Sequence, residues 1–174
     1  GVGAGLVLGG QIYRGRGGLA GEVGHAQVEW PGERCACGLR GCLEAYVGGA
    51  AWTRRLREIA PAGSGVLELA GGLDRITPEH AVEAARQGDS FALGEMDRFN
   101  TYLARGIVQL QLTLSPDVVV LGTIAVAAGE ELCFGPLREK VRDLLWPGVG
   151  DDLAIVPSGL GPELAYHAAL CAAG

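Results

Sequence analysis

One histidine and three cysteines within 18 residues constrain this chain more than any other feature, because the backbone must fold back on itself to bring them together. They are His25, Cys35, Cys37 and Cys42. Three thiolates and one imidazole make a complete tetrahedral set for a structural zinc ion, with no open position at which water could be activated. The number of cysteines is odd and the N-terminal residues show no export signal, so metal binding is favoured over disulfides. The sequence therefore predicts a zinc loop over residues 25–42.

Two carboxylates flank the predicted zinc loop. Glu22 stands three residues before the first predicted ligand, and Glu44 two residues after the last. A metal that fixes the loop would also fix these carboxylates as polar recognition groups at its edges. Arg34 and Arg40 stand beside the thiolates, where they either offset the negative charge of a three-thiolate zinc site or lie on the solvated surface.

Composition limits the classes of protein to consider. The 174 residues are enough for one domain with a sizeable core, and 48% of them are hydrophobic. The net charge of −6 argues against a nucleic-acid-binding surface, which needs a concentrated basic face. No apolar run reaches the roughly 18 residues of a membrane span. We expect a soluble, cytoplasmic protein with no membrane partner.

Strand patterns occur in four places. A glycine pair between two short apolar runs predicts a β-hairpin over 1–13, and weak alternation allows a short strand at 25–29. A run of β-branched residues predicts a buried parallel strand at 117–122, and a shorter apolar run predicts another at 153–156.

Helical periodicity fills most of the remaining chain. It marks five segments, which are 43–60 (interrupted near 48–49), 77–88, 89–114, 130–146 (broken near 135–136) and 160–173. Residues 61–73, rich in glycine and alanine, are expected to form a mobile connection, and Cys133 and Cys171 are expected to be buried small hydrophobes. Strands alternating with helices predict an α/β sheet with crossover helices.

The spacing Glu-x-Gly-His followed by Cys-x-Cys-Gly-x-x-Gly-Cys-x-Glu resembles the signature of the ROK family, which contains bacterial sugar kinases and sugar-responsive repressors. Every fixed position is occupied, by Glu22, Gly24, His25, Cys35, Cys37, Gly38, Gly41, Cys42 and Glu44. The resemblance implies an actin-like or hexokinase-like (ribonuclease H-like) α/β ATPase fold, in which two lobes close over a cleft. On this resemblance, residues 1–174 form a single domain, the larger C-terminal lobe, and the N-terminal lobe is missing.

The resemblance also implies sugar contacts for three residues. Glu22 and Glu44 would accept hydrogen bonds from sugar hydroxyls, while His25 would bind zinc with one ring nitrogen and present the other to a hydroxyl. A site that fixes such groups rigidly rejects analogues that lack the matching hydroxyls. The expected substrate is a hexose, most commonly glucose, and N-acetylated hexosamines, fructose and allose are further candidates within the family.

Nucleotide contacts are implied at two turns. Gly1 and Gly3 match the end of a Gly-Thr-Gly-x-Gly turn that approaches the phosphates, because backbone N–H groups without side chains can come close to phosphate oxygens. Residues 116–122 resemble the strand before the adenosine-contacting turn, so Gly122 and Thr123 are candidates, although the family usually has a second glycine where Thr123 stands. ATP with Mg²⁺ is the expected phosphoryl donor, and polyphosphate is an alternative.

The general base of the kinases, an aspartate in an Asn-Asp-x-Asn segment, has no match here. The single asparagine is Asn100, and none of the seven aspartates stands in such a context. We expect the base upstream of Gly1, so this chain would contain no catalytic residue and be inactive alone. The leading hypothesis is an ATP-dependent, glucokinase-like sugar kinase, expected to be a dimer or tetramer. The alternatives are the effector domain of a sugar-sensing repressor, whose partner would then be DNA, and a stand-alone zinc-binding interaction module.

Overall fold

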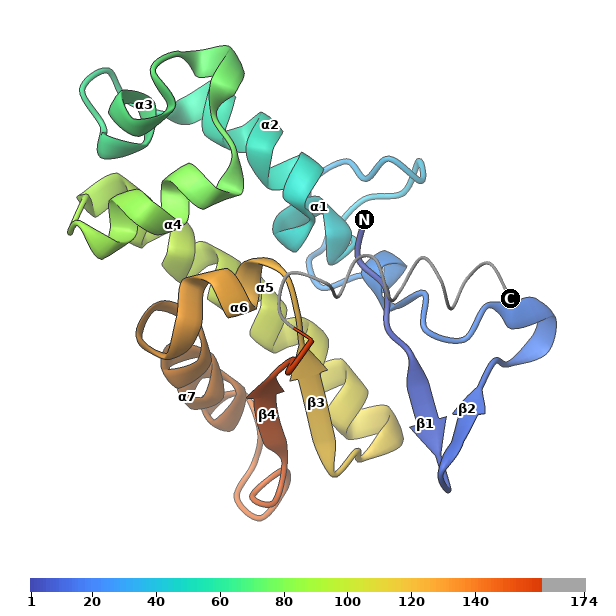
Figure 1. Cartoon of the computed structure of the whole chain (residues 1–174). Coiled ribbons are helices and arrows are strands. Elements are labelled where there is room, and N and C mark those ends of the chain that lie inside the picture. The colour runs from blue at the N-terminus through green and yellow to red at the C-terminus, as the bar shows by residue number, and fades with distance from the viewer. Residues whose placement is uncertain (161–174) are drawn as a thin grey trace.

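The structure is a computed structural model in which residues 1–160 are described. The helix expected over 160–173 and the expected burial of Cys171 lie outside the described residues. Figure 1 shows a β-hairpin on one side of the molecule, a group of helices on the opposite side, and a two-stranded parallel sheet below the point where they meet. Helices and strands therefore alternate as the sequence predicts.

A β-hairpin opens the chain, as predicted. Strands β1 (Leu6–Leu8) and β2 (Gln11–Tyr13) pair in antiparallel fashion. Gly9 and Gly10 form the turn with φ angles of 56° and 77°, the positive values that two-residue hairpin turns require. The N-terminus itself lies beside helix α1 (Glu44–Val47), next to the loop that carries the cysteines (Figure 1).

The segment between the hairpin and α1 contains almost no regular structure. Two short 3₁₀ turns occur, at Arg16–Gly18 and Val23–His25. The strand allowed at 25–29 is wrong: Gln27 forms only an isolated antiparallel bridge with Cys42. Side-chain contacts, described below, hold this segment instead of a ladder of backbone hydrogen bonds.

Helix α2 (Gly49–Ile59) continues α1 after the predicted interruption at Gly48, whose backbone is extended. The mobile connection expected over 61–73 is wrong in its central part. Helix α3 (Gly65–Ala70) forms there because Ser64 caps its N-terminus and Val66 is fully buried. A 3₁₀ turn at Leu73–Arg75 then leads into the next helix.

Two helices follow the predicted pattern closely. Helix α4 (Pro78–Arg86) begins with Thr77 as its N-cap, and the His80 side chain completes the capping box. Helix α5 (Ser90–Leu114) begins after Asp89, whose carboxylate accepts a hydrogen bond from the Ala92 N–H at 2.8 Å. It is the longest helix described and packs against α4 and against helix α7 (Gly135–Asp143).

The parallel sheet consists of β3 (Val118–Leu121) and β4 (Ala154–Pro157), both predicted. The expectation that 117–122 is wholly buried is wrong, because Val118 and Val120 are 49% and 58% exposed. Only the alternate residues of β3 pack against the core in the described part of the chain. One face of this sheet is therefore covered and the other is open among residues 1–160.

The helices of the crossover between β3 and β4 run from Ile124 to Asp143, earlier at both ends than the predicted 130–146, with a break in helical conformation at Gly129, whose φ is 76°. The crossover consists of helix α6 (Ile124–Gly129), a π-helical turn (Glu130–Phe134) and α7. The break predicted near 135–136 does not occur, because Pro136 occupies the first turn of α7, where its missing N–H leaves no bond unmade. Cys133 is fully buried, as expected. None of the helices within residues 1–160 combines the length and the apolar character needed to cross a bilayer.

Candidate functional site

The four predicted metal ligands come together in space. His25 ends a 3₁₀ turn, Cys35 and Cys37 lie on the following loop, and Cys42 lies just before α1; their ligand atoms are all within 4.8 Å of one another. His25 Nδ1 is 3.8 Å from Cys35 Sγ, and the Sγ atoms of Cys37 and Cys42 are 3.7 Å apart. Zn–S bonds of about 2.3 Å in tetrahedral geometry place two sulfur atoms about 3.8 Å apart. The cluster therefore has the dimensions of a site that could bind zinc.

At two positions of the Glu-x-Gly-His and Cys-x-Cys-Gly-x-x-Gly-Cys pattern, close backbone contacts leave room only for glycine. A Cβ atom on Gly24 would lie 2.1 Å from the Val2 carbonyl oxygen, and one on Gly41 would lie 1.8 Å from the Glu29 carbonyl oxygen. Gly41 also has a φ of 76°, which L side chains rarely adopt. The first contact brings the start of the loop next to the segment before β1, and the second brings the two halves of the loop together.

The thiols lie in different surroundings. Burial, together with the neighbouring thiols of Cys37 and Cys35, raises the pKa of Cys42 to about 12. A hydrogen bond from the Leu39 backbone lowers the pKa of the exposed Cys37. Three thiolates side by side would repel one another, so a divalent cation at their centre is the natural partner for the fully deprotonated set.

The structure brings two of the predicted sugar-binding residues side by side. His25 Nδ1 faces the thiols, while its Nε2 is 3.8 Å from Glu22 Oε2. The Glu22 side chain is 61% exposed, so its carboxylate is open to a ligand. One ring nitrogen of His25 is thus directed at the metal cluster and the other at a free carboxylate.

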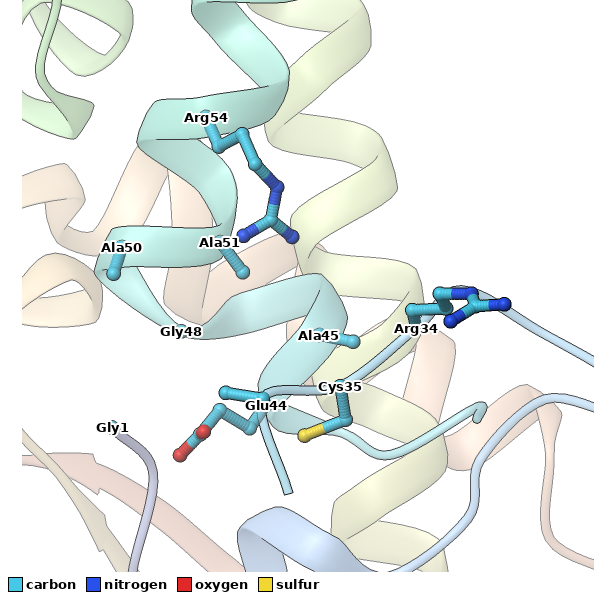
Figure 2. Close-up of a pocket in the computed structure, with 10 residues that line it drawn as sticks. Gly1, Arg34, Cys35, Glu44, Ala45, Gly48, Ala50, Ala51 and Arg54 are labelled. Carbon is cyan, nitrogen blue, oxygen red and sulfur yellow. The ribbon is translucent and has the colours of Figure 1, made fainter. Parts of the chain in front are cut away.

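Glu44 lies at the start of α1, and its Oε2 accepts a hydrogen bond from the Val2 backbone N–H at 2.8 Å. It borders a small pocket between α1, α2 and the zinc loop, where its carboxylate points toward Gly1 (Figure 2). The pocket is lined by Gly1, Arg34, Cys35, Ala36, Glu44, Ala45, Gly48, Ala50, Ala51 and Arg54. The small side chains of α1 and α2 leave this space.

One charged residue of the pocket, Arg54, could not be identified from the sequence, whereas Arg34 was singled out there. Arg54 belongs to the wet face of α2 by periodicity, and nothing in its spacing indicates that it borders a pocket with Glu44. Arg34 and Arg40 are both exposed, and Arg40 donates a hydrogen bond to the Gly32 carbonyl at 3.2 Å. Of the two roles considered for these arginines, their exposure favours the solvated surface.

The two pairs of candidate nucleotide residues lie in different settings, and only the second is at a turn. Gly1 and Gly3 lie in the segment before β1, Gly1 beside Glu44 and Gly3 beside Gly21. Gly122 and Thr123 follow β3, and Thr123 has a φ of 48°, a conformation that favours glycine. The threonine thus keeps the backbone geometry of a glycine turn at the position where the family pattern has a glycine.

The turn after β3 lies close to the pocket. A Cβ atom on Gly49, the first residue of α2, would lie 3.8 Å from the Ile124 side chain at the start of α6. The same end of α2 contributes Gly48, Ala50 and Ala51 to the pocket lining. The pocket bordered by Glu44 and the turn at Gly122 and Thr123 are therefore neighbours in the fold, although they are about 80 residues apart in sequence.

Comparison with known proteins shows both the fold of this chain and its family. The fold is the α/β fold of actin-like and hexokinase-like ATPases. It is similar to a ROK family glucokinase from Streptomyces griseus, solved in complex with glucose and AMPPNP (TM-score 0.83, 31% identity, 99% of this chain and 57% of that chain). It is also similar to the ROK hexokinase from Thermus thermophilus (TM-score 0.73, 30% identity, 92% of this chain and 49% of that chain). A sequence model of the ROK family matches residues 1–166, and the chain belongs to that family.

Curated relatives include both enzymes and regulators. The chain is 42% identical over 162 residues to the glucokinase of Thermotoga maritima, covering 92% of this chain and 51% of the glucokinase. It is 36% identical over 128 residues to the transcriptional regulator NagC of Escherichia coli, covering 73% of this chain and 31% of the regulator. The chain therefore spans about half the length of the glucokinase and about a third of the regulator.

Proposed function

We propose that this chain is the sugar- and zinc-binding lobe of an ATP-dependent hexose kinase of the glucokinase type. The observation that carries the proposal is the placement of His25, with one ring nitrogen directed at three cysteines and the other 3.8 Å from the Glu22 carboxylate. The 42% identity to a glucokinase supports the choice of a kinase. In this proposal residues 1–174 are a single domain, the larger C-terminal lobe of a two-lobe protein.

The metal has a structural role in this proposal. His25, Cys35, Cys37 and Cys42 would hold a zinc ion, which when bound would fix the loop and leave no coordination position for water. His25 Nε2 and the carboxylates of Glu22 and Glu44 would then bind the sugar hydroxyls. Two carboxylates in fixed positions recognise a hexose by the arrangement of its hydroxyls.

The phosphoryl donor would be ATP with Mg²⁺. Backbone N–H groups at Gly1 and Gly3 would approach the phosphates, and the turn at Gly122 and Thr123 would contact the adenosine. The general base would be an aspartate outside this chain, since the chain spans about half of the glucokinase that it resembles. The chain alone would therefore bind sugar without transferring phosphate, and the whole protein would act in the cytoplasm as a homo-oligomer.

The second candidate is the effector domain of a sugar-sensing repressor. The identity of 36% to NagC and of 25%, over 92% of this chain, to the xylose repressor of Bacillus spizizenii favours it. In that case the same sugar site would control binding of DNA by another part of the protein. The two candidates share the sugar and zinc residues and differ only in what lies outside this chain.

Two experiments test the proposal. First, calorimetry of this chain with a panel of hexoses should detect binding of glucose, and Glu44→Gln should weaken it about tenfold to a hundredfold. Glu58→Gln, on the exposed face of α2, is the matched control and should bind like the wild type. Second, the chain together with its natural N-terminal segment should convert glucose and ATP to glucose 6-phosphate. Sugar binding without turnover by that longer protein, combined with sugar-dependent release of DNA, would support the repressor.

A further inference from the structure

The middle of the zinc loop, residues 27–33, is attached to helix α5 by aromatic and charged side chains. Tyr46 of α1 and Tyr102 of α5 stack with ring centroids 3.8 Å apart and an interplanar angle of 20°. The Tyr46 hydroxyl accepts a hydrogen bond from the Glu33 backbone N–H at 2.7 Å. The Tyr102 hydroxyl donates to Glu29 Oε2 at 3.4 Å. The stacked pair therefore contacts the loop at two points.

Two arginines on the same face of α5 complete the arrangement. The Arg98 guanidinium lies 5.1 Å from each tyrosine ring centroid and pairs with Glu33. The Arg105 guanidinium lies 5.0 Å from the Tyr102 centroid, pairs with Glu29 and donates to the Val28 carbonyl at 3.3 Å. Residues 98, 102 and 105 share one face because they are spaced by four and three positions on a helix.

These six residues form what we call the loop clamp, which consists of Glu29, Glu33, Tyr46, Arg98, Tyr102 and Arg105. None of them is a metal ligand, and all of their loop contacts fall between His25 and Cys35. Isolated surface ion pairs contribute little to stability, but here two pairs share planar, stacked partners, and the Arg98 side chain is only 16% exposed. The clamp can thus hold the loop without help from a metal ion.

Backbone hydrogen bonds connect the residues held by the loop clamp to the segments that contain the cysteines. The Gly41 N–H donates to the Glu33 carbonyl at 2.8 Å, and the Val28 N–H donates to the Gly41 carbonyl at 2.8 Å. Gly41 directly precedes Cys42, while Glu33 is two residues before Cys35. Holding Val28 and Glu33 in place therefore fixes the backbone segments of the loop that contain the cysteines.

We propose that the loop clamp positions the zinc loop independently of the metal, so that the four ligands are prearranged and bound zinc is released slowly. Small metal sites that form only when the ion binds must draw on the binding energy to order the chain. A site held in place by its surroundings avoids this cost and keeps its ion longer. Arg98 and Tyr102 are thus positioning residues for the metal site and, through His25, for the sugar. This inference rests on the zinc binding proposed above.

Hydrogen exchange on chelator-treated protein tests the first half of the inference. The Val28 and Gly41 amides should stay protected in the metal-free wild type, while Arg98→Ala and Tyr102→Leu should exchange about tenfold faster at these positions. Asp97→Ala is the matched control, because Asp97 is the neighbour of Arg98 on α5 and pairs with Lys140 rather than with the loop. It should keep the protection of the wild type. An unprotected loop in the metal-free wild type would overturn the inference.

Zinc release tests the second half. With an excess of a chromogenic chelator, the two variants should release zinc about tenfold faster than the wild type and than Asp97→Ala. Equal release rates would overturn the inference. If the variants do not fold, Arg98→Lys should still release zinc a few times faster than the wild type. Tyr102→Phe keeps the stacked ring but loses the hydroxyl bond to Glu29, so its release rate should lie between those of the wild type and Tyr102→Leu. Release by Arg98→Lys at the wild-type rate would equally overturn the inference. A wild-type chain that takes up no zinc would refute the proposed metal site, whereas the exchange result would still report on the clamp.

Discussion

The zinc loop and the turn between β3 and α6 are both candidate binding regions, but different interactions hold them in place. The loop has no strand of its own, only two isolated bridges, Gln27 with Cys42 and Arg34 with Arg40. Its position depends on side chains from α5 and on single backbone hydrogen bonds, such as those of Gly41 with Glu33 and Val28. The turn after β3 lies between a parallel backbone ladder and a helix. The first region should therefore respond to the loss of one side chain, and the second to changes in backbone conformation.

The largest expected effect is the difference between two fully buried cysteines, Cys42 in the zinc loop and Cys133 in the helical crossover that follows the β3 turn. Cys42→Ala should abolish zinc binding and lower the free energy of unfolding by several kcal/mol, because the loop loses a ligand. It should also weaken sugar binding, since the His25 ring would no longer be held by the metal. Cys133→Ala, between β3 and β4, should leave zinc content unchanged and cost only the packing of its side chain. Elemental analysis and urea unfolding measure both. Retention of zinc by Cys42→Ala would contradict the four-ligand site.

The second prediction concerns backbone contacts in the loop. Gly41→Ala should destabilise the protein by about 3 kcal/mol or more, because its Cβ would meet the Glu29 carbonyl oxygen and its φ is positive. Gly63→Ala has a similar φ of 80° but nothing within 4 Å, so it should cost only about 1 kcal/mol. Equal changes in the urea midpoint of the two variants would show that the close contact is not important.

The third prediction is an increase in the free energy of unfolding, and it concerns the turn after β3. Thr123→Gly should stabilise the protein by about 0.5 kcal/mol, since glycine relieves the positive φ of 48° and loses part of that gain to the entropy of the unfolded chain. Thr123→Ala keeps the strained conformation and serves as the control. Thermal unfolding measures the shift, and a lower midpoint for the glycine variant would show that the Thr123 side chain contributes contacts of its own.

The smallest expected effect is a pH dependence of the loop clamp. The hydrogen bond and charge of Arg105, the first of these being the larger, lower the pKa of Glu29 below its ordinary value of 4.5. Because the folded-state pKa is lowered, the stabilisation is fully present above pH 4.5 and is lost as the pH falls through the folded-state value. The stability difference between wild type and Glu29→Gln should therefore shrink in acid. A difference that is the same at pH 7 and in acid would mean that the carboxylate charge is unimportant.

Local patterns were sufficient to predict the elements that local chemistry determines. The capped start of α4 at Thr77 and of α5 at Asp89, the hairpin turn at Gly9 and Gly10, and the metal cluster all follow from short-range spacing. Helix α3 was missed because its glycine- and alanine-rich context resembles a linker, and the Ser64 cap is decisive only together with the burial of Val66 in the folded protein.

Contacts between distant residues could not be predicted in this way. The ion pair between Glu29 and Arg105 joins positions 76 residues apart. The helical periodicity of 43–60 does not show what the Tyr46 hydroxyl contacts. The hydrogen bond between this hydroxyl and Glu33 depends on how the loop returns to α1. Similarly, the exposure of Val118 and Val120 depends on what packs against β3, which the β-branched run alone does not reveal.

The hydrogen bond from the Val2 N–H to Glu44 has a consequence for how the sugar and the nucleotide affect each other's binding. The same carboxylate that is proposed to hold the sugar restrains the glycine-containing segment proposed to meet the phosphates. A shift of Glu44 toward a bound hydroxyl would therefore move or release that segment. Since the coupling free energy between two sites is reciprocal, sugar would change the affinity for nucleotide by the same factor as nucleotide changes the affinity for sugar.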